Sequence, residues 1–316
     1  MKNYPIDQSP LYKLHSKRKL ENILCTNLDI EKMANYEGKN FKFFYITQGN
    51  KKRKVESPIP EIQELHRKIA RLLCRIDPPD YLYSATKKRS YLSNAQRHIG
   101  RHALIKVDIS KFFPSVSRLK VYNFFRFKMK CSPDVSAIIA KLLTVDGHLA
   151  TGSSASPILS YYANIDMFEE LYLLAKNRSA TMTCYIDDVC FSGEHVSKKL
   201  LYEVQKIIRR HGYVNHKQKA RYYSPGEVKL ITGVAVTSLG VRLPLRRHRA
   251  IRDGYTHIFT AKTDSDRLTQ LEKQVGRLFE ASQIDPSFKD KAKRASQARA
   301  NLKRRLLSKA FHPSSP

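Results

Sequence analysis

The sequence predicts an α+β fold in which an antiparallel sheet is backed by helices. Between residues 103 and 236, short runs rich in β-branched and aromatic residues alternate with amphipathic stretches of helical period. This alternation is typical of sheets that are covered by helices. From Arg246 onward the pattern is helical and strongly basic. A chain of 316 residues can bury a full core, here as one large domain with subdomains.

The charge balance indicates a polyanionic partner. Lys and Arg number 58 against 28 Asp and Glu, and the resulting formal net charge of +30 is spread along the chain. Nucleic acid matches such a surface better than an anionic membrane does. No apolar run approaches the roughly 18 residues of a spanning helix, and the first residues lack the apolar stretch of a signal peptide. The five cysteines include no Cys-x-x-Cys pair, so we expect reduced thiols, a cytoplasmic protein and no membrane partner.

The N-terminal third is predicted to contain a basic leader, a hairpin and a helix. Residues 1–35 form the leader, which is partly helical. Residues 41–46 predict a strand, and residues 48–50 its turn. The basic run at residues 51–55 follows, and a charge run of this kind is usually a solvated face. Pro60 opens an amphipathic helix that ends before Pro78, and a basic loop occupies residues 81–90.

The middle of the chain begins with a strand that ends in a carboxylate. Residues 103–107 are strand-like, and Asp108 follows them, with two aromatic residues and a proline shortly after. Residues 117–130 and 134–145 predict two helices, each opened by a capping residue. A loop of small residues then leads to Pro157, which suits the first turn of a long helix that extends to about residue 176. Backbone amides in such a loop can approach a nucleotide or a template strand closely.

Residues 181–193 predict a β-hairpin with an Asp-Asp pair at its tip. Neighbouring side chains of a regular strand point to opposite faces, so Asp187 and Asp188 can face one site only at the turn. A solvated turn is the alternative for such a dipeptide. If the strands that carry Asp108 and Asp187 lie side by side, the carboxylates form a cluster able to hold two Mg²⁺ ions about 3.5–4 Å apart. Such a pair of ions stabilises the attacking and leaving oxygens of an in-line phosphoryl displacement.

The remaining segments complete the expected sheet and begin the basic region. Residues 196–211 predict an amphipathic helix that Gly212 ends. Residues 230–236 and 241–243 predict two short strands joined by a turn. The helices that follow carry clusters of Arg and Lys together with one apolar face.

Two of these segments resemble motifs of reverse transcriptases. Residues 108–113 (Asp-Ile-Ser-Lys-Phe-Phe) resemble motif A, and residues 185–188 (Tyr-Ile-Asp-Asp) resemble motif C. The resemblance implies that Asp108, Asp187 and Asp188 are catalytic and hold two Mg²⁺ ions, with the backbone carbonyl of Ile109 as a further candidate ligand. It also implies that Phe113 lies beneath the nucleotide sugar and excludes a 2′-hydroxyl by steric conflict, whereas the alternative is a core aromatic.

Three further segments resemble parts of the same family that bind the nucleotide. The basic run resembles the fingers hairpin that grips the phosphates of the incoming nucleotide, with Arg53 as the first candidate and Lys51 as the second. Residues 151–157 resemble motif B, usually Gln-Gly-x-x-x-Ser-Pro, and here Thr151 replaces the Gln while Gly152 is retained. Residues 213–221 resemble motif D, with Lys219 as its lysine. That lysine would protonate the leaving pyrophosphate or pair with phosphate, and the alternative is a solvent-exposed lysine in a basic loop.

Two short patterns resemble signatures of retron reverse transcriptases, a bacterial branch of the family. Asn94-Ala95-Gln-Arg-His98 fits the pattern Asn-Ala-x-x-His, although a lone Asn or His is most often a cap or turn residue. Residues 231–233 resemble the Val-Thr-Gly triplet of these enzymes, with Thr232 and Gly233 retained. The resemblance suggests that these residues help to hold the retron RNA or its primer end.

The family fold implies a right hand. Residues 1–35 would form the leader, 36–107 the fingers, 108–240 a ferredoxin-like palm (with part of the fingers at about 115–150), and 241–316 a basic helical thumb that binds duplex and structured RNA. Phosphate contacts in such a thumb make binding salt-dependent.

The resemblance implies the function of a retron reverse transcriptase. Such an enzyme uses dNTPs to copy its cognate non-coding RNA, primes from a 2′-hydroxyl of a guanosine in that RNA, and leaves a branched RNA–DNA product. The complex commonly serves anti-phage defence with an effector protein, and a host RNase H would act separately. The alternatives are a group II intron-like or abortive-infection reverse transcriptase, and a non-catalytic RNA-binding scaffold. The short chain and the Asn-Ala-x-x-His pattern disfavour the first two, and the intact carboxylates disfavour the third.

Overall fold

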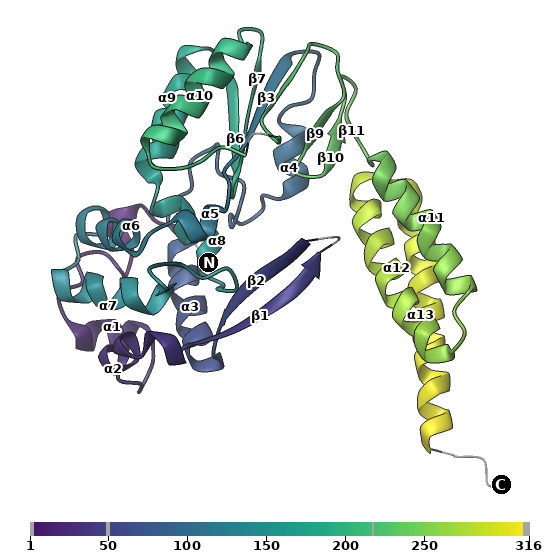
Figure 1. The fold of residues 1–316 in the computed structure, drawn as a ribbon, viewed down its shortest axis with the longest axis horizontal. Helices are drawn as coiled ribbons and strands as arrows, with labels where there is room; N and C mark the ends of the chain where they lie inside the picture. Colours follow the sequence, from purple (N-terminus) through teal and green to yellow (C-terminus); the bar gives the residue numbers. More distant parts are fainter. Residues whose placement is uncertain (1–2, 49–50, 217, 312–316) are drawn as a thin grey trace. The chain divides into compact units, whose positions relative to one another are not determined.

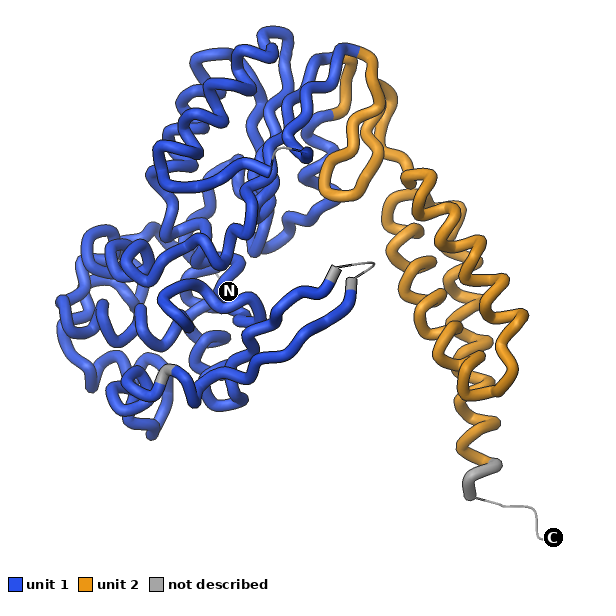
Figure 2. Tube along the Cα trace, viewed as in Figure 1, with its two compact units in different colours: residues 1–98, 102–225 blue, residues 99–101, 226–316 orange. Residues whose placement is uncertain are grey.

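A computed structural model of the chain describes residues 3–48, 51–216 and 218–311. The chain divides into two compact units (Figure 2). Unit 1 comprises residues 1–98 and 102–225, and unit 2 comprises residues 99–101 and 226–316.

A four-stranded antiparallel sheet is the centre of unit 1 (Figure 1). Its strands, in spatial order, are β6 (Thr181–Tyr185), β7 (Asp188–Gly193), β3 (Ala103–Asp108) and β8 (Arg221–Tyr223). The chain passes through helices between β3 and β6 and again between β7 and β8, which is the βαββαβ plan of a ferredoxin-like fold. Helices α9 (Ile165–Asn177) and α10 (Lys198–Arg210) pack on this sheet. The predicted α+β fold, an antiparallel sheet backed by helices, is confirmed.

The two faces of the sheet have different chemistry. Ile105 and Val107 of β3 are fully buried in the same apolar cluster as Leu171 of α9 and Val204 of α10. Because alternate residues of a strand point to the same face, Lys106 shares the opposite face with Asp108. The helices therefore cover one face of the sheet, and the other face carries charged residues.

Unit 1 also contains a long hairpin followed by a helix. Strands β1 (Phe41–Gln48) and β2 (Lys51–Pro58) pair in antiparallel register along their whole length, and part of the predicted turn, residues 49–50, lies outside the described residues. Helix α3 (Pro60–Leu73) begins with Pro60, whose missing N–H costs nothing in the first turn. Its residues Ile62, Leu65 and Ile69 are buried, as the apolar stripe predicts.

The other elements of unit 1 connect the hairpin and the sheet. They are the 3₁₀-helices Ile6–Gln8 and Glu37–Lys39, α1 (Lys17–Ile23), α2 (Ile30–Asn35), α4 (Tyr91–Gln96), α5 (Phe112–Ser115), α6 (Arg118–Asn123), the π-helix Phe124–Lys128, α7 (Pro133–Leu143), β4 (Thr144–Val145), β5 (His148–Leu149) and α8 (Ser156–Tyr162). The prediction of one long helix from Pro157 to about residue 176 is wrong, because the chain breaks between α8 and α9. At the break, Asn164 leaves the helical conformation, and its side chain accepts hydrogen bonds from Lys120 Nζ and Tyr213 Oη.

Unit 2 combines a small sheet with three helices. The sheet has the order β11 (Val241–Arg242), β10 (Val234–Val236), β9 (Lys229–Ile231). The helices are α11 (Leu245–Phe259), α12 (Asp264–Ile284) and α13 (Lys289–Phe311), with a 3₁₀-helix at Pro286–Phe288. Helix α12 packs against both α11 and α13, and its Leu271, Val275 and Leu278 are buried. Among the described residues of the chain, no helix is long and apolar enough to cross a membrane.

Candidate active site

Strand register brings two of the three predicted carboxylates together. Asp108, the last residue of β3, is the pairing partner of Asp188, the first residue of β7. Tyr185 of β6 pairs with Asp188, so Ile186 and Asp187 form a two-residue turn between β6 and β7. The Ile109 N–H donates to the carbonyl oxygen of Asp187 at 3.0 Å, which joins this turn to the segment after β3. The hairpin predicted for residues 181–193 is therefore present, with the Asp-Asp pair at its tip.

Two lysines contact the carboxylates. Lys219 Nζ donates to Asp108 Oδ2 at 2.7 Å, although the Lys219 side chain remains 52% exposed while that of Asp108 is 7% exposed. Lys106 Nζ lies 3.0 Å from Asp188 Oδ2, and both of these side chains are largely buried. Two ammonium groups thus neutralise part of the negative charge at this end of the sheet.

Burial and the repulsion between negative charges make the Asp187 and Asp188 carboxyls hard to ionise. Burial, together with the negative charges of Asp188 and Asp108, raises the pKa of Asp187 to about 6. Burial also raises the pKa of Asp188, against the opposing effect of Lys106. A cation in contact with the Asp187 and Asp188 carboxyls would favour their charged form, because a nearby opposite charge lowers the pKa of a carboxyl.

The donor atoms fit a hard divalent cation. Asp188 Oδ1 is buried and has no hydrogen-bond partner, so one carboxylate oxygen is available for a ligand. The candidate ligands are carboxylate and carbonyl oxygens, which Mg²⁺ prefers. Among the described residues, no three His, Cys, Asp or Glu side chains form one group close enough to hold a metal ion, and Lys106 and Lys219 contact two of the carboxylates instead.

The segment that carries Lys219 runs beside the end of β3. Ser110 N–H donates to the carbonyl oxygen of Val214 at 2.8 Å, and His216 N–H donates to that of Asp108 at 2.9 Å. These bonds explain how a residue more than a hundred positions away along the chain reaches Asp108. The structure therefore brings Lys219 together with the predicted metal ligands.

The loop that resembles motif B lies on strand β2. Thr151 Oγ1 accepts a hydrogen bond from the Glu56 N–H at 3.0 Å and donates to the Lys54 carbonyl at 3.3 Å. Gly152 is so close that an added Cβ would lie 2.8 Å from the Glu56 carbonyl oxygen. The side chain of Arg53, on the same strand, is exposed, whereas that of Lys51 lies outside the described residues. Thr151, Gly152 and Arg53 therefore belong to one assembly of loop and hairpin.

Phe113 lies in the short helix that follows β3. It is partly buried in α5 and stacks on Phe112, with 6.3 Å between the ring centroids. Helix α5 packs against α8. The described contacts place Phe113 at the margin of the core, and the residue is only partly buried.

The residues of the Asn-Ala-x-x-His pattern are buried in unit 1. The pattern starts in helix α4, and a capping box between Ser90 and Ser93 opens this helix. Asn94, Ala95 and His98 are each at most 1% exposed. His98 Nδ1 lies 2.7 Å from Ser192 Oγ on β7, and Nε2 lies 2.8 Å from Thr183 Oγ1 on β6. His98 therefore links the two strands of the Asp-Asp hairpin.

The second retron-like pattern forms a turn in unit 2. Ile231 pairs with Val234, so Thr232 and Gly233 are the central residues of a hairpin turn, and both have positive φ. Two positive φ values define a type I′ turn, which favours glycine. A Cβ at Gly233 would lie 2.9 Å from Arg247 Nη2, so the turn lies directly against a basic side chain.

Sequence reasoning missed two residues that support the site. The sequence could have indicated Lys106, because it precedes Asp108 by two residues and a strand places residues of this spacing on one face. Ser84 accepts a hydrogen bond from the Ile186 N–H at 3.1 Å, and it is 2% exposed. Nothing in its local sequence distinguishes it from any other loop serine.

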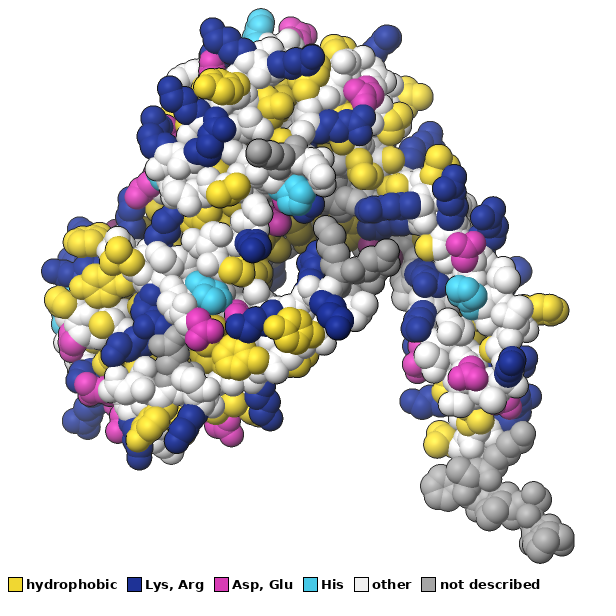
Figure 3. Space-filling model, in the orientation of Figure 1, with side chains coloured by type: hydrophobic (Ala, Val, Ile, Leu, Met, Phe, Trp, Pro, Cys, Tyr) yellow, Lys and Arg dark blue, Asp and Glu magenta, His cyan; other side chains and the backbone are white. Residues whose placement is uncertain are grey.

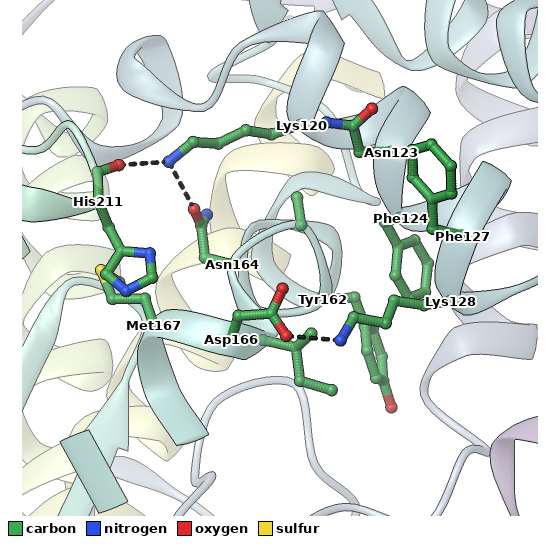
Figure 4. Close-up of a pocket in the computed structure, with 12 residues that line it drawn as sticks. Lys120, Asn123, Phe124, Phe127, Lys128, Tyr162, Asn164, Asp166, Met167 and His211 are labelled. Atoms are coloured by element: carbon green, nitrogen blue, oxygen red, sulfur yellow. Dashed lines mark hydrogen bonds and ion pairs between the residues drawn. The ribbon is translucent and has the colours of Figure 1, made fainter. Parts of the chain in front are cut away.

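A separate pocket of about 280 Å³ lies between α6, the π-helix and the junction of α8 with α9 (Figure 4). Lys120 Nζ lies at its edge, where it donates to the His211 carbonyl oxygen at 2.8 Å and to Asn164 Oδ1 at 3.1 Å. The same ammonium lies 3.9 Å from the centroid of the Tyr213 ring, and burial lowers its pKa to about 8. These contacts fix the end of α10 and the start of the segment that leads to Lys219.

Fold and site together define the class: an α+β chain whose ferredoxin-like sheet carries aspartates at the end of two neighbouring strands. Sequence comparison narrows the class. The chain is 31% identical to the retron Se72 reverse transcriptase of Salmonella heidelberg over 183 residues, which cover 56% of this chain and 47% of the relative. It is 25% identical to the retron Ec86 reverse transcriptase of Escherichia coli over 214 residues, 67% of each chain. It is 27% identical to the retron Mx162 reverse transcriptase of Myxococcus xanthus over 227 residues, which cover 62% of this chain and 47% of the relative.

The chain is thus homologous to retron reverse transcriptases, which are RNA-directed DNA polymerases, and the predicted resemblance is confirmed. Its matches span about half to two thirds of the length of these relatives. No protein-family model matches the chain. Among solved structures, a foamy viral protease-reverse transcriptase in complex with double-stranded DNA has a TM-score of 0.49, at 18% identity, over 82% of this chain and 38% of the other. Telomerase from Candida albicans in complex with a fragment of telomeric RNA has the same TM-score, at 11% identity, over 82% of this chain and 58% of the other.

Proposed function

We propose that the chain is the RNA-directed DNA polymerase of a retron. The observation that carries this proposal is the register of β3 and β7, which puts Asp108 opposite Asp188 with Asp187 in the adjoining turn. An RNA-binding scaffold would need neither this register nor the unpartnered carboxylate oxygen of Asp188. Homology to retron enzymes supports the same function.

In this proposal Asp108, Asp187 and Asp188 hold two Mg²⁺ ions, with the carbonyl oxygen of Ile109 as a further ligand. The bound ions would activate the attacking hydroxyl and neutralise the leaving pyrophosphate. Lys219 contributes a cation that lies at Asp108 yet is half exposed, so it can turn to the pyrophosphate and pair with it or donate a proton. Lys106 neutralises part of the charge of Asp188 from the same face of the sheet.

The nucleotide would be bound by the loop and hairpin around β2. Arg53 supplies an exposed guanidinium for the phosphates of the dNTP. Thr151 and Gly152 act by holding β2 in place through bonds to the Glu56 and Lys54 backbone. Phe113 presents part of an aromatic ring that would reject a 2′-hydroxyl.

RNA binding is proposed for both units. Asn94, Ala95 and His98 are buried, so their contribution to RNA binding is indirect, through the shape of the surface above α4. Thr232 and Gly233 present backbone groups in a tight turn beside Arg246 and Arg247, a suitable arrangement for phosphate. Lys and Arg side chains are numerous on the visible face of each unit (Figure 3). The leader, fingers, palm and thumb at residues 1–35, 36–107, 108–240 and 241–316 belong to the same proposal.

The reaction would start from a 2′-hydroxyl of a guanosine in the cognate non-coding RNA and use dNTPs to form a branched RNA–DNA product. A host RNase H would remove copied RNA separately, and the complex would act with an effector protein in anti-phage defence in the cytoplasm.

The test is to express the chain with the few hundred base pairs upstream of its gene and to search for a short DNA joined to RNA. A chimera that is sensitive to debranching enzyme, and absent for Asp187→Asn with Asp188→Asn, supports the proposal. Primer extension on RNA without such a chimera would retain the polymerase and reject the retron assignment.

A further inference from the structure

The turn that carries Asp187 has an unfavourable backbone conformation. Ile186, its first residue, has φ +58°. Left-handed backbone conformation is rare for any residue other than glycine and is a genuine outlier for a β-branched side chain. Such a residue keeps this conformation only when its surroundings impose it. The contacts of Ile186 therefore determine where the two adjoining carboxylates point.

A loop from a distant part of the chain supplies those contacts. The Cys184 N–H donates to the Tyr81 carbonyl oxygen at 2.7 Å, and the Tyr83 N–H donates to the Cys184 carbonyl oxygen at 2.8 Å. Residues 81–83 thus run alongside the end of β6 and form a parallel bridge with it. One residue further on, Ser84 Oγ accepts the hydrogen bond of the Ile186 N–H at 3.1 Å. Ser84 is 2% exposed, so water does not easily replace it.

Side chains of Arg89 and Thr86 fix the loop itself. Arg89 Nη1 donates to the carbonyl oxygens of Pro79 and Leu82 at 2.5 and 2.7 Å. Thr86 Oγ1 donates to the Ser84 carbonyl oxygen at 3.1 Å, which holds Ser84 from its other side. The support for the Ile186 turn is therefore a pre-formed loop rather than a mobile side chain.

We infer that Ser84 is a positioning residue for the Asp187 and Asp188 carboxylates, and that it sets their affinity for divalent cations. The inference rests on the proposed function only in naming the carboxylates as metal ligands. Without its acceptor, the part-buried Ile186 N–H loses its hydrogen-bond partner, and the turn can relax toward negative φ. Relaxation moves both carboxylates, since they occupy the next two positions in the chain.

The experiment compares Ser84→Ala with the unaltered full-length protein. Mn²⁺ binding is followed by the electron paramagnetic resonance signal of the free ion, and primer extension is measured across a Mg²⁺ titration. We expect Mn²⁺ affinity to fall about tenfold and the half-saturating Mg²⁺ concentration to rise by a similar factor. Ser84→Thr keeps the hydroxyl oxygen and should restore both values to within about threefold. Ser136→Ala is the matched control, because Ser136 is fully buried and its hydroxyl donates to the Ser132 carbonyl oxygen at the start of its own helix.

A double-mutant cycle separates positioning from general stability. Glycine adopts positive φ at no steric cost, so Ile186→Gly removes the strain that Ser84 opposes. In that background, Ser84→Ala should lower Mn²⁺ affinity by less than threefold. Equal losses in both backgrounds, or unchanged Mn²⁺ affinity in Ser84→Ala, would overturn the inference. A protein that binds Mn²⁺ as expected but extends no primer would instead contradict the proposed function.

Discussion

The strongest structural prediction concerns His98, the last residue of the retron-like pattern in α4. His98→Ala removes two hydrogen bonds, to Ser192 Oγ and to Thr183 Oγ1, in a site that is 1% exposed. Each buried hydrogen bond contributes about 1 kcal/mol, and the space left by the imidazole adds a cavity cost of about 1–2 kcal/mol. The expected loss of unfolding free energy is therefore about 3–4 kcal/mol.

Urea denaturation followed by circular dichroism measures this loss. With an m-value of about 3 kcal/mol/M, the midpoint should fall by about 1 M. His102→Ala is the matched control, because His102 is exposed and lies only four residues away; its midpoint should hardly change. If His98→Ala has the stability of the unaltered protein but no longer binds the retron RNA, His98 contacts RNA and the structural reasoning is wrong.

Three other predictions follow from the structure. Burial lowers the pKa of His66 to about 4, so between pH 6.5 and 4 this histidine takes up a proton only in the unfolded chain. The free energy of unfolding should therefore fall by up to about 3 kcal/mol as the pH falls through this range. His66→Gln should flatten the pH dependence of the urea midpoint. Phe113→Ala should raise ribonucleotide incorporation about tenfold or more in primer extension with mixed nucleotides, and unchanged sugar discrimination would refute its assigned role. Gly152→Ala should lower the melting temperature, because the added Cβ would meet the backbone of β2. Gly276→Ala is the control: Gly276 lies in a helix with open space around it, so this change should stabilise the protein by about 0.5–1 kcal/mol and raise the melting temperature slightly.

The sequence predicts the carboxylate hairpin well because its signals are local. Runs rich in Thr, Tyr, Ile, Val and Phe on both sides of Asp187 and Asp188 predict a hairpin from local sequence alone. Asp108 follows a strand that is almost entirely apolar, so its position at a sheet end is also predictable. The breaks and short elements are not predictable in the same way. Asn164 ends α8 through bonds to Lys120 and Tyr213, which are far away in sequence.

The short helix α4 shows why burial is harder to predict than secondary structure. Its sequence mixes Tyr, Leu and Ala with Ser, Asn and Gln, and this short pattern does not indicate which side chains are buried. The structure buries Asn94 and His98, and the hydroxyls of Ser192 and Thr183 satisfy the two ring nitrogens of the histidine. A pattern that resembles a binding signature is thus packed inside the fold, and only the partners on β6 and β7 reveal this.

The candidate metal ligands lie within short sequence motifs, whereas the residues that support them lie far away in the sequence. The candidate ligands lie in short segments, so family motifs detect them. Their supports come from elsewhere: Ser84 is 102 residues from Ile186, and Lys219 is 111 residues from Asp108. Contacts over such distances form only when the βαββαβ unit folds, because the sheet order β6-β7-β3-β8 brings the ends of separate segments together. A protein that kept all three carboxylates but lost these supports would retain the motifs and lose the geometry, so motif matching alone overestimates how much of an active site is present.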